Sequence, residues 1–241
     1  MSIDAETAAS QREINRARLA RWLFELLYRN RTLYWLASTL PFAGQWRVWQ
    51  RLALTRLRGS DVLEVGCGIG SLLADMVASG FQCQAVDRSP QMVAAARREL
   101  RRRGLAADTR IVQQASVQAL PFDAASFDCV VSTFPTEYIA DPAALREIER
   151  VLRPGGKLIV VLGAALLPTR PLLRPLIAVQ RLVYGRAEVD AQTSAQPDAQ
   201  PAIVAPLLDR MRAAGFAPTM ERVAGPFWVA YVITAYTATN T

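Results

Sequence analysis

The sequence predicts an α/β fold in which helices cover both faces of a doubly wound, mostly parallel sheet. Two observations predict it. Short apolar segments typical of buried strands alternate with amphipathic segments typical of helices over residues 61–162. The first strand also runs into a glycine-rich turn, the kind of junction at which such sheets hold cofactors.

The first strand–helix junction is the most informative segment. Residues 62–65 are Val-Leu-Glu-Val, and glycines follow at positions 66, 68 and 70. The turn presents bare backbone to a ligand, and the helix predicted at residues 71–78 aims its free N–H groups at the same place. A dinucleotide-binding turn would have the spacing G-x-G-x-x-G, which is absent here. Glu64 would repel a pyrophosphate and attract a sulfonium or an ammonium, so a cationic cofactor is favoured.

Two motifs indicate a family. The pattern E-x-G-x-G-x-G from Glu64 to Gly70 resembles the first motif of class I S-adenosylmethionine-dependent methyltransferases. Residues 145–156, LREIERVLRPGG, resemble the small-molecule "type 11" members of that family, which include quinone and sterol methylating enzymes. The resemblance covers residues 61–162 well and the flanks poorly. It implies a Rossmann-like methyltransferase sheet of seven strands whose last strand is antiparallel, with S-adenosylmethionine as methyl donor and no metal.

The second unit is predicted as a strand over residues 81–86. Asp87 stands at its end, where an acid can accept hydrogen bonds from both ribose hydroxyls. Ser89 and Pro90 predict the start of a helix, as N-cap and first-turn residue respectively. This segment resembles the family's D-x-S-x-x-M pattern, which implies that Met92 flanks the adenine.

The third unit departs from the family pattern. Residues 111–114 are predicted as a strand, and residues 115–122 resemble the family's G-D-A-x-x-L-P-F segment. Ser116 replaces the aspartate that normally accepts a hydrogen bond from the adenine amino group, and Val117 would border the same ring. A hydroxyl accepts such a bond more weakly than a carboxylate, so we expect loose cofactor binding.

The fourth unit carries the candidate catalytic residues. Residues 127–132 are predicted as a buried strand, followed by a loop, a helix at residues 143–152 and a new strand at residues 158–161. Tyr138 stands where this group usually has a histidine, and the whole chain contains no histidine. Histidine-based general base catalysis and histidine-ligated metals are therefore excluded. Alignment of nucleophile and methyl group can supply most of the rate. Glu137 and Tyr138 are the candidates if a proton must leave; the alternative is that Tyr138 packs its ring and Glu137 is solvated.

The predicted cofactor site comprises the residues of these four junctions. They are Glu64, Gly66, Cys67, Gly68, Gly70, Asp87, Arg88, Met92, Ser116, Val117, Ser132, Thr133 and Phe134, the last three near the reactive sulfur. Cys67 is interpreted as a packed residue rather than a nucleophile. With Cys83 and Cys129 it lies in or beside a predicted buried strand, which indicates reduced core cysteines and a cytoplasmic protein.

The domain organisation follows from length and flanking segments. The 241 residues, 51% hydrophobic, predict one full core. We expect an N-terminal helical cap at residues 1–58 and a methyltransferase domain at residues 59–241, with a lid insertion at residues 164–201. The cap contains an amphipathic helix within residues 12–36 and a short helix at residues 46–57. The domain closes with a helix at residues 202–214 and strands at residues 216–223 and 227–236.

The net charge and the placement of basic residues indicate which kinds of partner, nucleic acid or membrane, are expected. The net charge is +7, and Lys157 is the only lysine. The largest arginine cluster, within residues 97–103, is expected to complement a helix dipole without any partner, and no nucleic-acid-binding motif is present. The first ten residues are polar, and no run of about 20 apolar residues occurs. Residues 168–186 form a basic apolar helix that Pro175 interrupts or begins; it can lie on an anionic membrane surface or cover a greasy substrate.

The sequence therefore predicts an enzyme, a methyltransferase that uses S-adenosylmethionine and acts on a small, lipophilic acceptor such as a quinone or a lipid-like molecule. Two alternatives stay open. A nicotinamide-dependent oxidoreductase is disfavoured by the glycine spacing, by Glu64 and by the closing pair of strands. A non-catalytic relative that only binds the cofactor would keep the same binding residues.

Overall fold

The structure is a computed structural model, and it describes residues 42–105, 109–169, 171–184 and 204–237. The helix expected within residues 12–36 lies outside the described residues, and so do residues 185–201 of the expected lid insertion. Seven strands form one sheet in the order β3-β2-β1-β4-β5-β7-β6. Their bounds are β1 Asp61–Val65, β2 Gln82–Asp87, β3 Val112–Gln114, β4 Phe127–Thr133, β5 Leu152–Leu166, β6 Phe216–Ala224 and β7 Trp228–Thr237.

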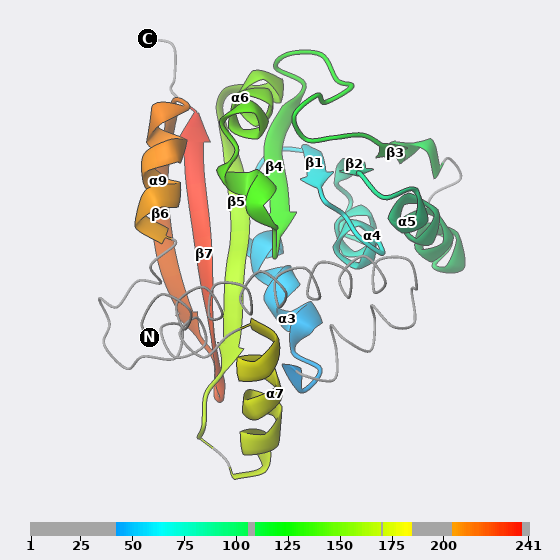
Figure 1. The fold of residues 1–241 in the computed structure, drawn as a ribbon. Helices are drawn as coiled ribbons and strands as arrows, with labels where there is room; N and C mark the ends of the chain where they lie inside the picture. The colour runs from blue at the N-terminus through cyan, green and yellow to red at the C-terminus, as the bar shows by residue number, and fades with distance from the viewer. Residues whose placement is uncertain (1–41, 106–108, 170, 185–203, 238–241) are drawn as a thin grey trace, which may run out of the picture.

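The first five strands pair in parallel, whereas β7 runs antiparallel to both of its neighbours, β5 and β6 (Figure 1). The predicted fold class, with its antiparallel last strand, is confirmed. The chain order reverses at β1, which has β2 on one side and β4 on the other. Open α/β sheets bind ligands at the carboxyl ends of the strands that flank such a reversal.

Helices cover both faces of the sheet. The α-helices with described bounds are α3 Trp46–Gln50, α4 Ser71–Ala78, α5 Pro90–Arg102, α6 Pro142–Val151, α7 Arg174–Tyr184 and α9 Val204–Ala213. The 3₁₀ segments are η2 Arg51–Arg56, η3 Thr109–Ile111, η4 Glu137–Ala140 and η5 Pro171–Leu173. Along the strands, side chains alternate between two cores: Leu63 and Val130 pack with α6 and α9, and Val62 and Val131 pack with α4 and α5.

The predicted helix starts agree with the capping geometry. The Ser89 hydroxyl accepts a hydrogen bond from the Met92 backbone N–H at 3.4 Å, and Pro90 is the first residue of α5. Pro175 is the second residue of α7, so it begins this helix rather than interrupting it.

Strand β5 is longer than predicted. It was expected to end at residue 161 but continues to Leu166, because β7 pairs with it as far as Leu166 opposite Trp228. The register shifts between Val161 and Gly163, which lets the strand continue past a residue that looked like its end. The first residues of the expected lid insertion are therefore strand residues.

The arginine cluster at the end of α5 also has partners within the protein, which adds to its favourable place at the helix C-terminus. Arg97 donates two hydrogen bonds, at 3.0 and 2.7 Å, to the backbone oxygen of Val112. Arg102 and Arg103 both bind the buried Glu99, and together they lower its pKa to about 2 although burial opposes this. These cations hold the end of α5 in place rather than forming a free basic surface.

Candidate active site

The glycine turn lies at the carboxyl end of β1. Gly66, Gly68 and Gly70 all have positive φ, at 71°, 53° and 76°, a conformation that favours glycine. The backbone N–H of Gly66 donates to the oxygen of Val86 at 2.9 Å, which ties the turn to β2. A Cβ atom on Gly70 would lie 2.7 Å from the Cβ of Ala96, so this glycine also lets α4 approach α5 closely.

A buried acid lies directly before this turn. Glu64 is 1% exposed, and its Oε2 has no hydrogen-bond partner among the described residues. Burial raises the pKa of Glu64 to about 8, the charge of Asp87 adds to this, and a hydrogen bond with the Leu73 backbone opposes it. Buried polar atoms in proteins are almost always paired. An unpaired carboxylate oxygen beside a glycine turn therefore fits a ligand that brings its own cation or hydrogen-bond donor.

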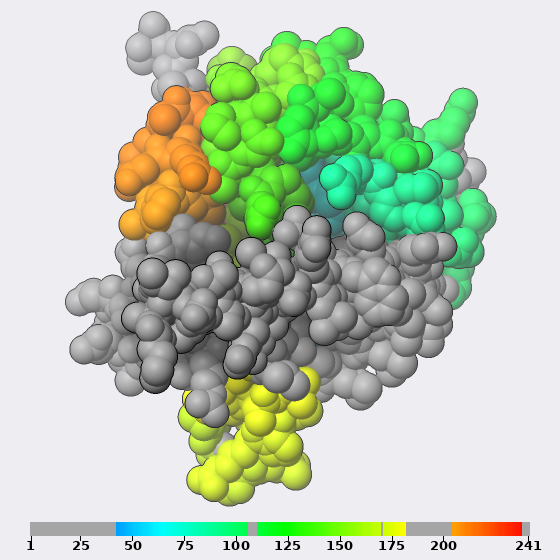
Figure 2. All heavy atoms as spheres, viewed as in Figure 1, coloured from blue at the N-terminus to red at the C-terminus, as the bar shows by residue number. Residues whose placement is uncertain are grey.

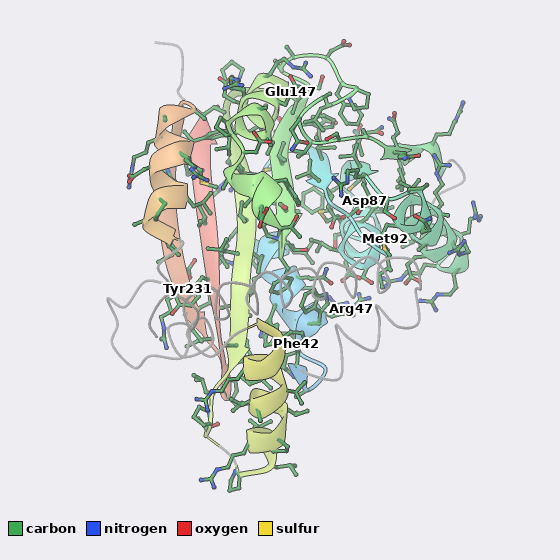
Figure 3. All side chains as sticks on the ribbon, in the orientation of Figure 1. Phe42, Arg47, Asp87, Met92, Glu147 and Tyr231 are labelled. Atoms are coloured by element: carbon green, nitrogen blue, oxygen red, sulfur yellow. The ribbon has the colours of Figure 1, made fainter. Side chains whose placement is uncertain are left out.

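Asp87 is oriented by two backbone groups at the end of β2. Its Oδ2 accepts from the Gly68 N–H and its Oδ1 from the Ser89 N–H, both at 2.9 Å. Burial raises the pKa of Asp87, and these two hydrogen bonds and the charge of Arg88 counteract it. Each carboxylate oxygen has a lone pair left, so Asp87 can accept two hydroxyl groups of a ligand. Figure 3 shows Asp87 at the end of β2 and Met92, which is buried, near the start of α5.

Ser116 lies in the loop after β3, beside this acid. The Ala115 N–H donates to the backbone oxygen of Asp87 at 3.2 Å, which fixes the loop against β2. The Ser116 hydroxyl donates to the side-chain oxygen of Gln118, and its lone pairs remain able to accept a bond from a ligand. Val117 next to it is buried.

Two hydroxyl groups meet above the first glycine. The hydroxyl oxygens of Ser132 and Tyr138 are 2.7 Å apart, and each lies 3.3 Å from the backbone oxygen of Val65. A Cβ atom on Gly66 would lie 2.6 Å from the Tyr138 hydroxyl, so this group sits directly on the turn. Glu137 is exposed on η4. The two catalytic candidates thus separate, and only Tyr138 lies at the glycine turn.

An aromatic wall, which the sequence analysis missed, stands beside the loop after β4. The Phe134 ring stacks on Trp46 with centroids 4.0 Å apart and an interplanar angle of 25°. Phe134 has φ of +50°, which is rare for a bulky residue and indicates a strained position held by its surroundings. Gln50 of α3 donates to the Thr133 hydroxyl at 3.3 Å. The wall consists of Phe42, Trp46, Trp49, Phe134 and Trp228.

One feature of the sequence could have indicated part of the aromatic wall. Trp46 and Trp49 are three residues apart, a spacing that puts both rings on one side of a helix. Nothing in the sequence indicated that this side faces the loop after β4.

The cysteines and acids of the site suggest no further chemistry. Cys67, Cys83 and Cys129 are buried free thiols; burial raises the pKa of all three, and that of Cys83 to about 12. Such thiols behave as core residues, as expected from the sequence. Among the described residues, no cluster of three or more histidine, cysteine, aspartate or glutamate side chains is arranged to bind a metal ion.

Comparison with known sequences identifies the domain. Residues 63–160 match the family model described as "Methyltransferase domain". The chain is 35% identical over 150 residues to the ubiquinone/menaquinone biosynthesis C-methyltransferase UbiE of Serratia proteamaculans, covering 59% of this chain and 57% of that protein. It is 36% identical over 117 residues to a demethylmenaquinone methyltransferase of Clavibacter sepedonicus, covering 48% and 46%. The chain thus spans about half the length of the curated relatives it matches.

Solved structures agree in fold. A putative S-adenosylmethionine-dependent methyltransferase of Methanococcus maripaludis matches with a TM-score of 0.57 and 20% identity, covering 85% of this chain and 90% of that one. The [4+2]-cyclase SpnF matches with a TM-score of 0.54 and 21% identity, covering 80% and 81%. These likenesses support the fold alone. This fold agrees with the match of residues 63–160 to a methyltransferase domain.

Proposed function

We propose that this chain, whose residues 63–160 match a methyltransferase domain, is a class I methyltransferase that transfers a methyl group from S-adenosylmethionine to a small, lipophilic acceptor. The observation that carries the proposal is the unpaired oxygen of the buried Glu64 beside the glycine turn. A second acid, Asp87, is close enough to raise the pKa of Glu64. Two carboxyl groups at the turn favour a cationic ligand and oppose a pyrophosphate.

The cofactor side of the site would be held by residues that the sequence analysis named. S-adenosylmethionine, when bound, supplies a methyl group activated by its sulfonium. Glu64 and the glycine turn would bind the methionine portion, and Asp87 would accept the ribose hydroxyls. Met92, Ser116 and Val117 would border the adenine. Cys67 and Arg88 flank these groups in the chain, with Cys67 buried and Arg88 exposed.

The acceptor side would be formed by the loop after β4. The hydroxyls of Ser132 and Tyr138 offer a polar contact beside an otherwise apolar surface. Thr133 and Phe134 would lie near the reactive sulfur, with the aromatic wall behind them. One relative named above is a ubiquinone/menaquinone biosynthesis C-methyltransferase and the other a demethylmenaquinone methyltransferase, so a reduced quinone ring is the acceptor class to test first.

Calorimetric titration with S-adenosylhomocysteine tests the cofactor assignment. We expect micromolar binding to the wild type and a loss of about 100-fold or more in Asp87→Ala, since hydrogen bonds to a charged group contribute about 1.5–3 kcal/mol each. Asp87→Asn, which keeps one acceptor oxygen, should lose less. Asp209→Ala on the exposed side of α9 is the matched control and should bind like the wild type. Tighter binding of NADH than of S-adenosylhomocysteine would refute the proposal.

A peripheral membrane contact of a cytoplasmic protein, through residues 168–186, is part of the same proposal. Leu172 is 83% exposed and Val179 is 42% exposed, and Arg174 and Arg181 are exposed on the same segment. Figure 2 shows α7 projecting at one end of the molecule. An apolar and basic surface of this kind suits an anionic bilayer, from which a lipophilic acceptor would come. None of the described helices has the length and apolar character needed to cross a bilayer.

Vesicle flotation tests this contact. We expect the wild type to float with anionic vesicles and to float less with neutral ones. The double variant Leu172→Glu/Val179→Glu should remain unbound at the bottom of the gradient with both kinds of vesicle. Val48→Glu is the control, because Val48 is as exposed as Val179, at 42%, but belongs to α3. Equal flotation of all three proteins, or none by the wild type, would remove the membrane contact from the proposal.

A further inference from the structure

The carboxylate of Asp75, on the helix that follows the glycine turn, forms ion pairs with three arginines. It lies in α4 and is 8% exposed. Arg47 donates to both of its carboxylate oxygens, at 2.6 and 2.7 Å, Arg51 donates at 2.7 Å and Arg103 at 2.8 Å. Two of the three arginines come from α3 and η2, which precede the sheet, and the third ends α5. One carboxylate therefore joins three segments that are remote in the sequence.

The negative charge of Asp75 is needed to hold the three positively charged arginines close together. Burial alone would raise the pKa of Asp75, but Arg51, Arg103 and Arg47 together hold it below its usual value. The acid stays ionised at neutral pH. Without it, three guanidinium groups that share one binding point would repel each other, and removing one member of a partly buried ion network is strongly destabilising.

Helix α3 needs such an anchor. It has five residues, far fewer than an isolated helix requires, so contacts from its side chains must fix its position. Arg47 holds one side of it to α4 through Asp75. Trp46 stacks on Phe134, and Gln50 donates to Thr133. Figure 3 shows Arg47 and Phe42 at α3. The helix thus bridges the segment after the glycine turn and the loop after β4.

We infer that Asp75 is a positioning residue of the acceptor site. Its carboxylate fixes α3, and α3 holds Trp46 of the aromatic wall against Phe134. Asp75 belongs neither to the proposed cofactor-binding residues nor to the aromatic wall, and it acts through Arg47 and Arg51. The consequence for the acceptor rests on the proposed function, whereas the consequence for the position of Trp46 does not.

The experiment compares Asp75→Asn with Glu99→Gln. Glu99 is buried to a similar degree, with 5% of its surface exposed. Like Asp75 it pairs with Arg103, but its other partner is Arg102 at the end of α5. Full-length protein labelled with 5-fluorotryptophan gives a fluorine resonance for Trp46, assigned from Trp46→Phe. We expect this resonance to shift and broaden in Asp75→Asn and to stay unchanged in Glu99→Gln. Binding of S-adenosylhomocysteine should stay within about twofold in Glu99→Gln. Asp75→Asn also removes a charge that raises the pKa of Glu64, so its cofactor affinity is measured beside the resonance.

Kinetics with a reduced, unmethylated naphthoquinone as probe give the second readout. We expect Asp75→Asn to raise KM for this probe about tenfold, because a displaced wall orients the acceptor poorly, and Glu99→Gln to leave it unchanged. If Asp75→Asn does not fold, Arg47→Met/Arg51→Met removes the same link while Arg103 still pairs the acid. An unmoved Trp46 resonance, or equal effects of the two carboxylate variants, would overturn the inference. Absence of S-adenosylhomocysteine binding by the wild type would instead refute the proposed function.

Discussion

Replacing Glu64 with glutamine is expected to weaken S-adenosylmethionine binding by about 100-fold, the cost of removing one member of a buried ion pair. The pKa of Glu64 is about 8 without ligand, so most of these side chains carry a proton at pH 7. An ammonium placed against the unpaired Oε2 would favour the ionised carboxylate. Binding should then release most of one proton from the wild type and none from Glu64→Gln.

Calorimetry in buffers of different ionisation enthalpy measures this release directly. In the wild type, affinity should rise as pH increases from 6.5 to 8.5, because the ionised carboxylate becomes populated without ligand; in Glu64→Gln this dependence should vanish. Methylthioadenosine, which lacks the amino-acid portion, is the ligand control and should release no proton. Release that is equal in wild type and Glu64→Gln would contradict the assigned role of Glu64.

The raised pKa of Glu64 also makes the stability of the folded protein depend on pH. The folded-state pKa of Glu64 is raised from 4.5 to about 8, so the folded protein holds a proton that the unfolded chain has lost. The contribution of Glu64 to stability is therefore largest below pH 4.5 and falls as pH rises from 4.5 to about 8. This behaviour follows from burial of an acid whose Oε2 has no hydrogen-bond partner among the described residues, and a bound cation would reverse it.

The elements at the sheet edge could be predicted because their signals are local. The helix at residues 71–78 has the predicted bounds, since the glycine turn fixes where it begins. Ser89 could be recognised as a cap from its place before Pro90. The end of β5 could not be predicted, because it depends on the pairing of Leu166 with Trp228 of β7, 62 residues later in the chain.

The parts of the site that sequence reasoning missed depend on contacts between distant segments. Arg47 lies 28 residues before Asp75, and Arg103 lies 28 residues after it. Nothing local distinguishes these residues from solvated charges. Trp46 and Phe134 are likewise brought together only by the fold. Of the two catalytic candidates, sequence could not separate Glu137 from Tyr138, because they are neighbours and the direction of each side chain depends on η4.

Replacing Tyr138 with phenylalanine is expected to lower kcat by about 100-fold, the lower end of what a positioned acid–base group contributes. The Tyr138 hydroxyl lies against the glycine turn and 2.7 Å from Ser132, so it can form a hydrogen bond with an acceptor hydroxyl beside the cofactor and orient it. Single-turnover rates with the naphthoquinol probe measure the effect, and binding of S-adenosylhomocysteine should stay within about twofold because no cofactor contact is removed. Glu137→Gln is the control and should retain full activity, since Glu137 is exposed.

Ser132→Ala separates the two possible roles of the tyrosine. It removes the hydroxyl that orients Tyr138 but leaves the tyrosine itself, so a functional hydroxyl pair predicts an intermediate loss of rate. If Tyr138 only packs its ring, Tyr138→Phe should cost about 1 kcal/mol of stability through the lost hydrogen bond and leave kcat unchanged. In that case alignment of acceptor and methyl group would have to supply the rate without an acid–base group, in a chain that has no histidine to take its place.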